Sequence, residues 1–82
     1  FITVDTQSSA STDDLDTING GDRGDQVTFY AASSARDVVF KDGTGNLRLA
    51  GDFTLSHTDD TITLRNNGAN VWIEVARSDN AA

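Results

Sequence analysis

The stretch TITLRNNGANVWIEVARS, residues 61–78, decides the fold of this chain. Aliphatic residues recur at every second position on both sides of Asn66-Asn67-Gly68, and a triplet of this composition is typical of a turn. A repeat of two residues predicts a strand with one buried face. The stretch therefore predicts two half-buried strands joined by a turn.

The same repeat extends back to residue 27, and the starts of successive groups lie 6 to 11 residues apart. The groups are Val27/Phe29/Ala31, Val38/Phe40, Leu47/Leu49, Phe53/Leu55, Ile62/Leu64 and Val71/Ile73/Val75. Gly, Asn and Asp fill most of the gaps and favour turns. The window from Ala31 to Asp37 is predicted to be a loop with at most one helical turn. Short strands at this spacing indicate an all-β unit.

The acidic residues point the same way, because 12 of the 13 are Asp and only Glu74 is Glu. Asp favours turns and caps over helix interiors. We expect an all-β module of short antiparallel or solenoid-like strands, intertwined as a homotrimeric β-prism or a β-helix-like module. A small β-sandwich is the alternative, since no strict sequence repeat selects between these architectures.

Two parts are expected along the chain: a polar N-terminal strand and linker segment, residues 1–17, and the β-module, residues 18–82. The run QSSASTDDLD, residues 7–16, holds one large apolar residue, Leu15, and is typical of a linker or of a segment draped over a partner. Ile2 and Val4 before it predict a short strand. The chain starts at Phe1 rather than Met, so we expect it to be part of something longer.

The core is expected to need more than one copy of the chain, because 37% hydrophobic residues are few for a domain of 82 residues. There is no Cys for disulfide bonds or a thiolate zinc site, and one His makes no cluster. Further copies of the chain are the remaining support. The residues expected in the core or the oligomer interface are Val27, Phe29, Phe40, Leu49, Phe53, Leu55, Ile62, Leu64, Trp72, Glu74 and Arg77.

Alternation along residues 71–76 places Val71, Ile73 and Val75 on one face and the residues between them on the other. Trp72, on the second face, is expected to anchor a contact with another subunit. Glu74 on that face is expected to pair with Arg65 or Arg77, because an unpaired buried carboxylate is costly.

A net charge of −7 argues against binding nucleic acid or an anionic membrane through a basic surface. No run approaches the 18 apolar residues that a membrane-spanning helix needs. We therefore expect neither nucleic acid nor a membrane among the partners.

Short motifs give weak indications of chemistry. Arg23-Gly24-Asp25 matches an integrin-binding tripeptide but is also an ordinary surface turn. The acids at 13, 14, 16, 22 and 25 could supply oxygen ligands to Ca²⁺, but their spacing matches no known loop. Ser56-His57 with Asp59 and Asp60 has the residue types of a hydrolytic triad, yet it sits in a predicted turn. We predict no catalytic residue, no cofactor and no metal site.

Five motifs, in order, resemble a module found in tailed-bacteriophage virion proteins, and the likeness covers about residues 2 to 80. The motifs are DDLDTINGG (13–21), VVFKDGTGNL (38–47), LAGDFTL (49–55), DTITL (60–64) and the pattern Trp72-x-Glu74-x-x-Arg77-Ser78-x-Asn80. In that family the module lies towards the C-terminal end of fibre, spike or head-decorating proteins, which are generally homotrimers. The sequence departs from the family pattern at Asp22-Arg23, within the glycine turn, and at Asn66-Asn67.

The resemblance implies a non-enzymatic virion structural protein on the exterior of the particle. It implies a trimeric module that decorates the capsid or forms part of a fibre or spike, with Ala82 as the end of the chain. Its partners would be further copies of itself and other virion proteins. The alternative is a host-surface module of a tail fibre that binds glycan on the host cell. The resemblance implies no catalytic residue.

Overall fold

The computed structural model describes residues 2–43 and 45–80, and in these ranges it holds two β-sheets, one short 3₁₀ turn, η1 (Gln7–Ser9), and no α-helix. The larger sheet has the order β1 (Ile2–Val4), β3 (Gln26–Ala31), β7 (Thr61–Asn66), β8 (Trp72–Ser78), β5 (Leu47–Arg48). The smaller sheet has the order β2 (Thr12–Leu15), β4 (Asp37–Phe40), β6 (Phe53–Leu55). The all-β prediction is confirmed, and each of the six apolar groups contributes to a strand.

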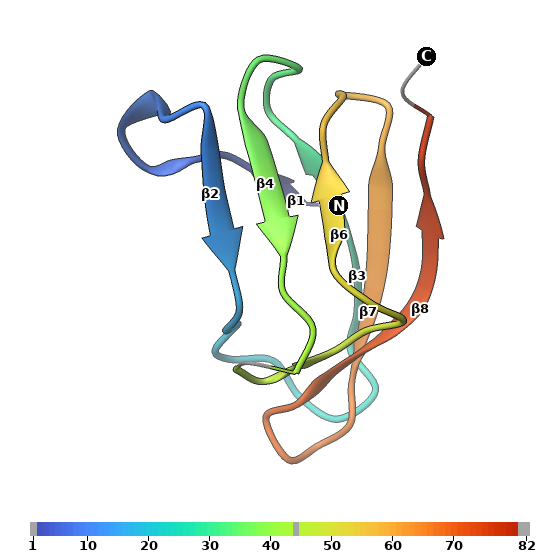
Figure 1. The fold of residues 1–82 in the computed structure, drawn as a ribbon. Helices are drawn as coiled ribbons and strands as arrows, with labels where there is room; N and C mark the ends of the chain where they lie inside the picture. Colours follow the sequence, from blue (N-terminus) through green and yellow to red (C-terminus); the bar gives the residue numbers. More distant parts are fainter. Residues whose placement is uncertain (1, 44, 81–82) are drawn as a thin grey trace.

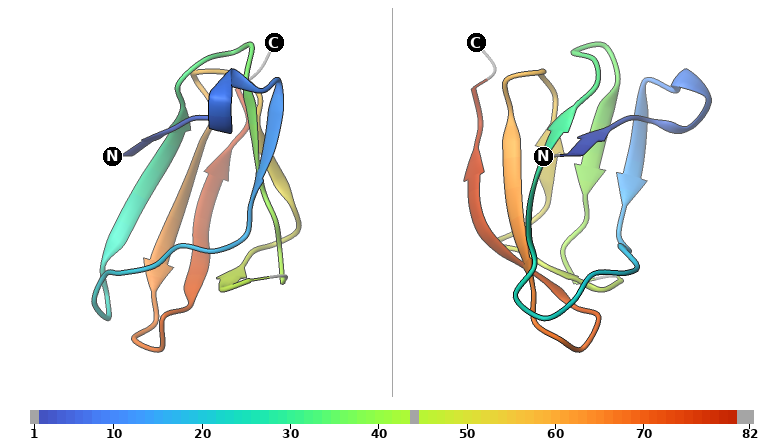
Figure 2. Two further views of the ribbon diagram at one scale, coloured as in Figure 1. Left: turned by 90° about the vertical axis from the view of Figure 1, so that its left-hand side faces the viewer. Right: turned by 180° about the vertical axis from the view of Figure 1, so that it is seen from behind.

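The two sheets form two layers (Figures 1 and 2). Successive strands alternate between the layers from β1 to β7, so most turns carry the chain across the molecule instead of closing a hairpin. β1 pairs with β3, β2 with β4 and β5 with β8 in parallel, whereas β3–β7, β4–β6 and β7–β8 are antiparallel. The sheets are therefore mixed, where mainly antiparallel or solenoid-like strands were expected. This two-layer arrangement is compatible with the small β-sandwich alternative.

The hairpin of β7 and β8 contains a register shift, and the core side of β8 is not the expected one. Thr63 pairs with Ala76 and Leu64 with Glu74, which leaves Val75 without an opposite residue, as in a β-bulge. Trp72 is 3% exposed and Val75 is 49% exposed, so the core side of β8 is the side of Trp72. The expectation that Val75 belongs to a buried face is wrong, because Trp72 and Glu74 take the core side and Val75 lies on the opposite side of the strand.

The N-terminal segment belongs to both sheets. β1 lies beside β3, as the short strand predicted there, but Thr12–Leu15 also forms a strand and pairs in parallel with β4. The interpretation of residues 7–16 as a linker is therefore wrong for this part. A polar sequence forms an edge strand here because backbone groups make the ladder and only Leu15 packs against the core.

The segment after Ala31 is the predicted loop, and it contains no helical turn. An isolated bridge joins Ser33 and Arg36, and β4 starts at the next residue. Among the described residues, no helix is long and apolar enough to cross a membrane.

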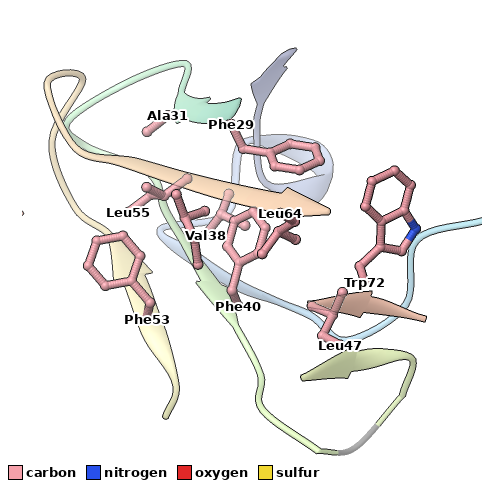
Figure 3. Close-up of a cluster of buried hydrophobic side chains, with 10 residues drawn as sticks. Phe29, Ala31, Val38, Phe40, Leu47, Phe53, Leu55, Leu64 and Trp72 are labelled. Atoms are coloured by element: carbon pink, nitrogen blue, oxygen red, sulfur yellow. The ribbon is translucent and has the colours of Figure 1, made fainter. Parts of the chain in front are cut away.

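One chain encloses a hydrophobic core between its two sheets (Figure 3). The Phe29 ring on β3 meets the Phe40 ring on β4 with 5.5 Å between centroids, across the two layers. Full burial of one such side chain stabilises a fold by about 1.5–3 kcal/mol. The buried hydrophobic residues are Phe29, Ala31, Val38, Phe40, Leu47, Phe53, Leu55, Ile62, Leu64 and Trp72.

Candidate functional site

The eleven residues predicted for the core or interface all lie in or beside the core of a single chain. Seven of them, all apolar, are buried there: Phe29, Phe40, Phe53, Leu55, Ile62, Leu64 and Trp72. Val27 and Leu49 are half-buried and pack against these. Glu74 and Arg77 form an ion pair at the margin. Within one copy these residues thus belong to the core or its margin, and their role at an oligomer interface stays a prediction.

Trp72 closes one end of the core (Figure 3). The loop between β2 and β3 covers its ring so closely that a Cβ on Gly21 would lie 2.8 Å from Trp72 Cζ2. The backbone at Gly21 also has φ +83°, which suits glycine. The indole N–H is buried and has no hydrogen-bond partner among the described residues. Trp72 is thus a core residue and not an exposed edge residue.

Glu74 and Arg77 form a clamp between β8 and the loop that leads into β6. Arg77 donates to Glu74 through two nitrogens, at 2.9 and 2.6 Å, and to the Gly51 carbonyl at 2.8 Å. The Ala50 N–H donates to Glu74 Oε1 at 3.0 Å. The Arg77 guanidinium also lies 4.7 Å above the centre of the Phe53 ring. The predicted pairing of Glu74 with an arginine is confirmed, and the partner is Arg77.

Glu74 and Arg77 each stabilise the charged form of the other. Hydrogen bonds from Arg77 lower the pKa of Glu74 below its usual value, and the bond from Ala50 adds to the effect against the opposing influence of burial. The hydrogen bonds to Glu74 raise the pKa of Arg77 correspondingly. The side chain of Glu74 is 12% exposed and that of Arg77 is 29% exposed, so solvent screens this pair only in part.

Asp60 forms a second clamp at the other end of β8. Its fully buried carboxylate accepts the N–H and O–H of Ser56 at 3.1 and 3.2 Å and the N–H of Asn80 at 2.6 Å. Burial raises the pKa of Asp60, but these bonds and one from the His57 backbone outweigh it, so the pKa lies below its usual value. Asp60 thereby joins the end of β6 to the segments that flank β7 and β8.

The triad-like group of residues 56–60 is not arranged as a nucleophile and base. The Ser56 hydroxyl donates to Asp60, and His57 Nδ1 accepts the Asp59 N–H at 3.1 Å. A hydroxyl activated by histidine would have to bond to the imidazole. These hydrogen bonds stabilise the turn between β6 and β7.

The residues considered for calcium and for integrin binding lie in edges and turns. No group of three or more His, Cys, Asp or Glu that could hold a metal ion occurs in residues 2–43 and 45–80. Asp25 accepts the Asp22 N–H at 2.7 Å through its carboxylate, so that carboxylate is engaged inside its own turn. The geometry therefore favours a structural role for this turn.

A cavity of about 310 Å³ opens where β1 and η1 pass β2. Two of its carboxylates already have partners within the chain, since Asp5 pairs with Arg36 at 2.6 Å and Asp13 accepts the Gln7 N–H at 2.9 Å. The lining residues are Val4, Asp5, Thr6, Gln7, Asp13, Asp14, Leu15 and Val38.

The outer faces of the two sheets carry different charges, which the sequence analysis did not detect. None of the 12 Asp residues lies in a strand of the larger sheet. Asp14 and Asp37, in contrast, lie on the outer face of the smaller sheet, where Val39 and Thr54 are also found. The alternation of Thr61 and Thr63 with buried Ile62 and Leu64 is the sequence signal that could have revealed an outer face without acids.

Comparisons with protein-family models, with curated proteins and with solved structures find no match to this chain.

Proposed function

We propose that this chain is a non-enzymatic structural module of a bacteriophage particle, which assembles as a homotrimer on the exterior and decorates the capsid or forms part of a fibre or spike. The proposal starts from the five motifs that resemble tailed-phage virion modules. It is supported by the contacts that residues of these motifs make with one another in the fold.

The motif residues contact one another across the molecule, and this observation carries the proposal. Gly21 of the first motif lies against Trp72 of the last. Asn46 of the second motif accepts the Ile18 N–H at 2.8 Å and donates to the Ile18 carbonyl at 2.6 Å. Gly51 of the third motif accepts a bond from Arg77 of the last.

The fourth motif is joined to the last in the same way, since Asp60 accepts the Asn80 N–H. Lys41 and Asp52, from the second and third motifs, form a salt bridge at 2.8 Å. The residues behind the resemblance therefore hold the architecture together, which is what a structural module requires of its motifs.

A shared core of three chains is not needed for this role, because one chain buries its own apolar residues. Trimer formation in the proposal uses the surface of a folded chain. The Asp residues outside the larger sheet would keep the rest of that surface soluble on a crowded particle.

Host-surface glycan binding is the alternative function. A glycan site is usually lined by exposed aromatic side chains. Among the described residues, Tyr30 is half-buried and every Phe and Trp is buried. A glycan array with reproducible hits would favour this alternative over a structural role.

The test of the proposed function is immunogold labelling. Antibodies raised against the purified chain are applied to purified particles of the phage whose genome encodes it, and the particles are imaged by electron microscopy. Label on the head or the tail is the expected result. Intact particles without label, alongside soluble chain in the lysate, would overturn the proposal.

A further inference from the structure

We propose that the chain associates with further copies of itself through the outer face of the five-stranded sheet. This inference rests on the self-association in the proposed function and names the surface that would carry it. The surface is called the neutral face here, and its residues are Thr28, Tyr30, Thr61, Thr63, Ala76 and Ser78.

Strand register places these residues in two neighbouring rows. Tyr30 is opposite Thr61, and Thr61 is opposite Ser78. Thr28 is opposite Thr63, and Thr63 is opposite Ala76. Their strand neighbours Phe29, Ile62 and Leu64 are buried, so alternation turns the neutral face away from the core.

Charge is the argument for a second copy of the chain as the occupant. Each chain carries −7, and copies that meet through Asp-bearing surfaces repel one another. The strands of the larger sheet contain one acid, Glu74, which is paired with Arg77 and turned to the margin of the core. The neutral face is thus a sheet surface through which two negatively charged copies can meet without bringing their carboxylates together.

The polar groups on the neutral face also suit burial. The Thr28 and Thr63 hydroxyls bond to each other at 2.8 Å, so one donor of the pair is already satisfied within the chain. Burying a hydroxyl without a partner is costly, and a paired one costs less. Ala76 is small and exposed, and Val75 beside it is 49% exposed. Contact with another copy would remove this apolar surface from water.

A sheet face also offers more room for a partner than a sheet edge. The neutral face runs across three neighbouring strands, β3, β7 and β8, whereas an edge offers a single short strand. One partner in a standard interface contributes about 800 Å², so the face is the more suitable surface.

The arginines of the larger sheet lie outside the two rows. Arg65 and Arg48 are both opposite Ile73, in the next row towards one end of the sheet, and both are exposed. Neither forms a salt bridge in the described part of the chain. The neutral face itself therefore carries no charge of either sign.

The test introduces one acid into the face. Ala76→Asp is compared with Ala76→Asn, which has the same shape without the charge, and with Thr54→Asp, which puts the acid on the outer face of the smaller sheet. Sedimentation velocity over a range of concentrations measures the association, and circular dichroism verifies that each variant is folded. We expect Ala76→Asp to raise the dissociation constant at least tenfold and both controls to stay near wild type.

A second measurement uses the absence of cysteine from the chain. Ala76→Cys should give cross-linked oligomers with a short bismaleimide, and Thr54→Cys should give few. If Ala76→Asp associates as wild type does, or if both cysteine variants cross-link equally, the neutral face is not the contact surface. This result would not contradict self-association through another surface. A wild-type chain that is monomeric at every concentration would overturn the self-association itself. Antibody label on particles tests the virion role separately.

Discussion

The five-stranded and three-stranded sheets differ in what holds each of them in place. β3, β7 and β8 are six or seven residues long and pair with one another along most of their length. The strands of the smaller sheet have three or four residues, and so short a sheet has little stability of its own. It is held through the apolar layer beneath it and through two polar clamps, Glu74–Arg77 and Asp60. The smaller sheet therefore depends on the larger one for its stability.

Removing the apolar layer should have the largest effect. Phe40→Ala deletes a fully buried ring that packs on Phe29 across the two sheets, and we expect a loss of about 3–5 kcal/mol in the free energy of unfolding. Urea unfolding followed by Trp72 fluorescence measures this. Val39→Ala, on the same strand but half-buried and facing outward, is the control and should cost about 1 kcal/mol or less. Equal losses would contradict the two-layer core.

Removing the Asp60 clamp should come next. Asp60→Ala removes a fully buried carboxylate and leaves the donors of Ser56 and Asn80 without their acceptor, so we expect a loss of about 3 kcal/mol. The matched control is Asp59→Ala, whose side chain is 72% exposed and which should change stability by about 0.5 kcal/mol or less. Similar effects of the two variants in urea unfolding would show that the Asp60 carboxylate is not a clamp.

The Asp60 clamp also predicts a dependence on pH. The pKa of Asp60 is lower in the folded than in the unfolded chain, so the unfolded chain binds the proton more readily. The stabilisation is fully present above the unfolded pKa of about 4 and is lost as pH falls through the folded pKa. The stability gap between wild type and Asp60→Asn should therefore narrow from pH 7 to pH 3. A constant gap over this range would contradict the shift.

The second clamp should have a smaller effect, because solvent reaches it. Arg77→Ala removes the partner of Glu74 and the contact with Phe53, and we expect a loss of about 2 kcal/mol, between the values for exposed and buried pairs. Arg65→Ala is the control, since Arg65 is exposed and forms no salt bridge in the described residues. Chemical denaturation of both variants distinguishes a clamp from an ordinary surface arginine.

The cover over Trp72 gives the smallest expected difference. Gly20 and Gly21 both have positive φ, so alanine is strained at either position. Only a Cβ at position 21 would also press on Trp72, since nothing lies within 4 Å of one at position 20. We expect Gly21→Ala to lower stability by about 1 kcal/mol more than Gly20→Ala. Identical melting temperatures would show that the loop does not hold the indole in place.

The fold was predictable from the sequence where strands repeat with a period of two. Ile62 and Leu64 lie on one buried face as expected, and so do Phe53 and Leu55. β2 could not be predicted, because an edge strand pairs through its backbone and Asp13 and Asp14 carry no apolar signal. The parallel pairings of β1 with β3, β2 with β4 and β5 with β8 could not be predicted from the sequence either. Turn residues favour a reversal, and whether a turn joins neighbours or crosses to the other sheet is decided by packing elsewhere in the chain.

The candidate site was predictable in part. Glu74 was expected to need an arginine because a stranded carboxylate is costly, and Arg77 meets that need. Strict alternation would put residues 74 and 77 on opposite faces, and the bulge at Val75 brings them together. Asp60 gave no signal, since an acid in a turn is usually solvated and only the folded chain surrounds this one with donors.

The alternation of successive strands between the sheets also determines when each strand can pair during synthesis of the chain. During synthesis, β1 can pair only after β3 has been made, and β3 can complete its pairing only after β7 has been made. β5 can pair only after β8, the last strand, has been made. Contacts between distant parts of a sequence slow folding. The module is therefore expected to fold late and all at once, and a chain cut before β8 should be degraded instead of accumulating as a stable fragment.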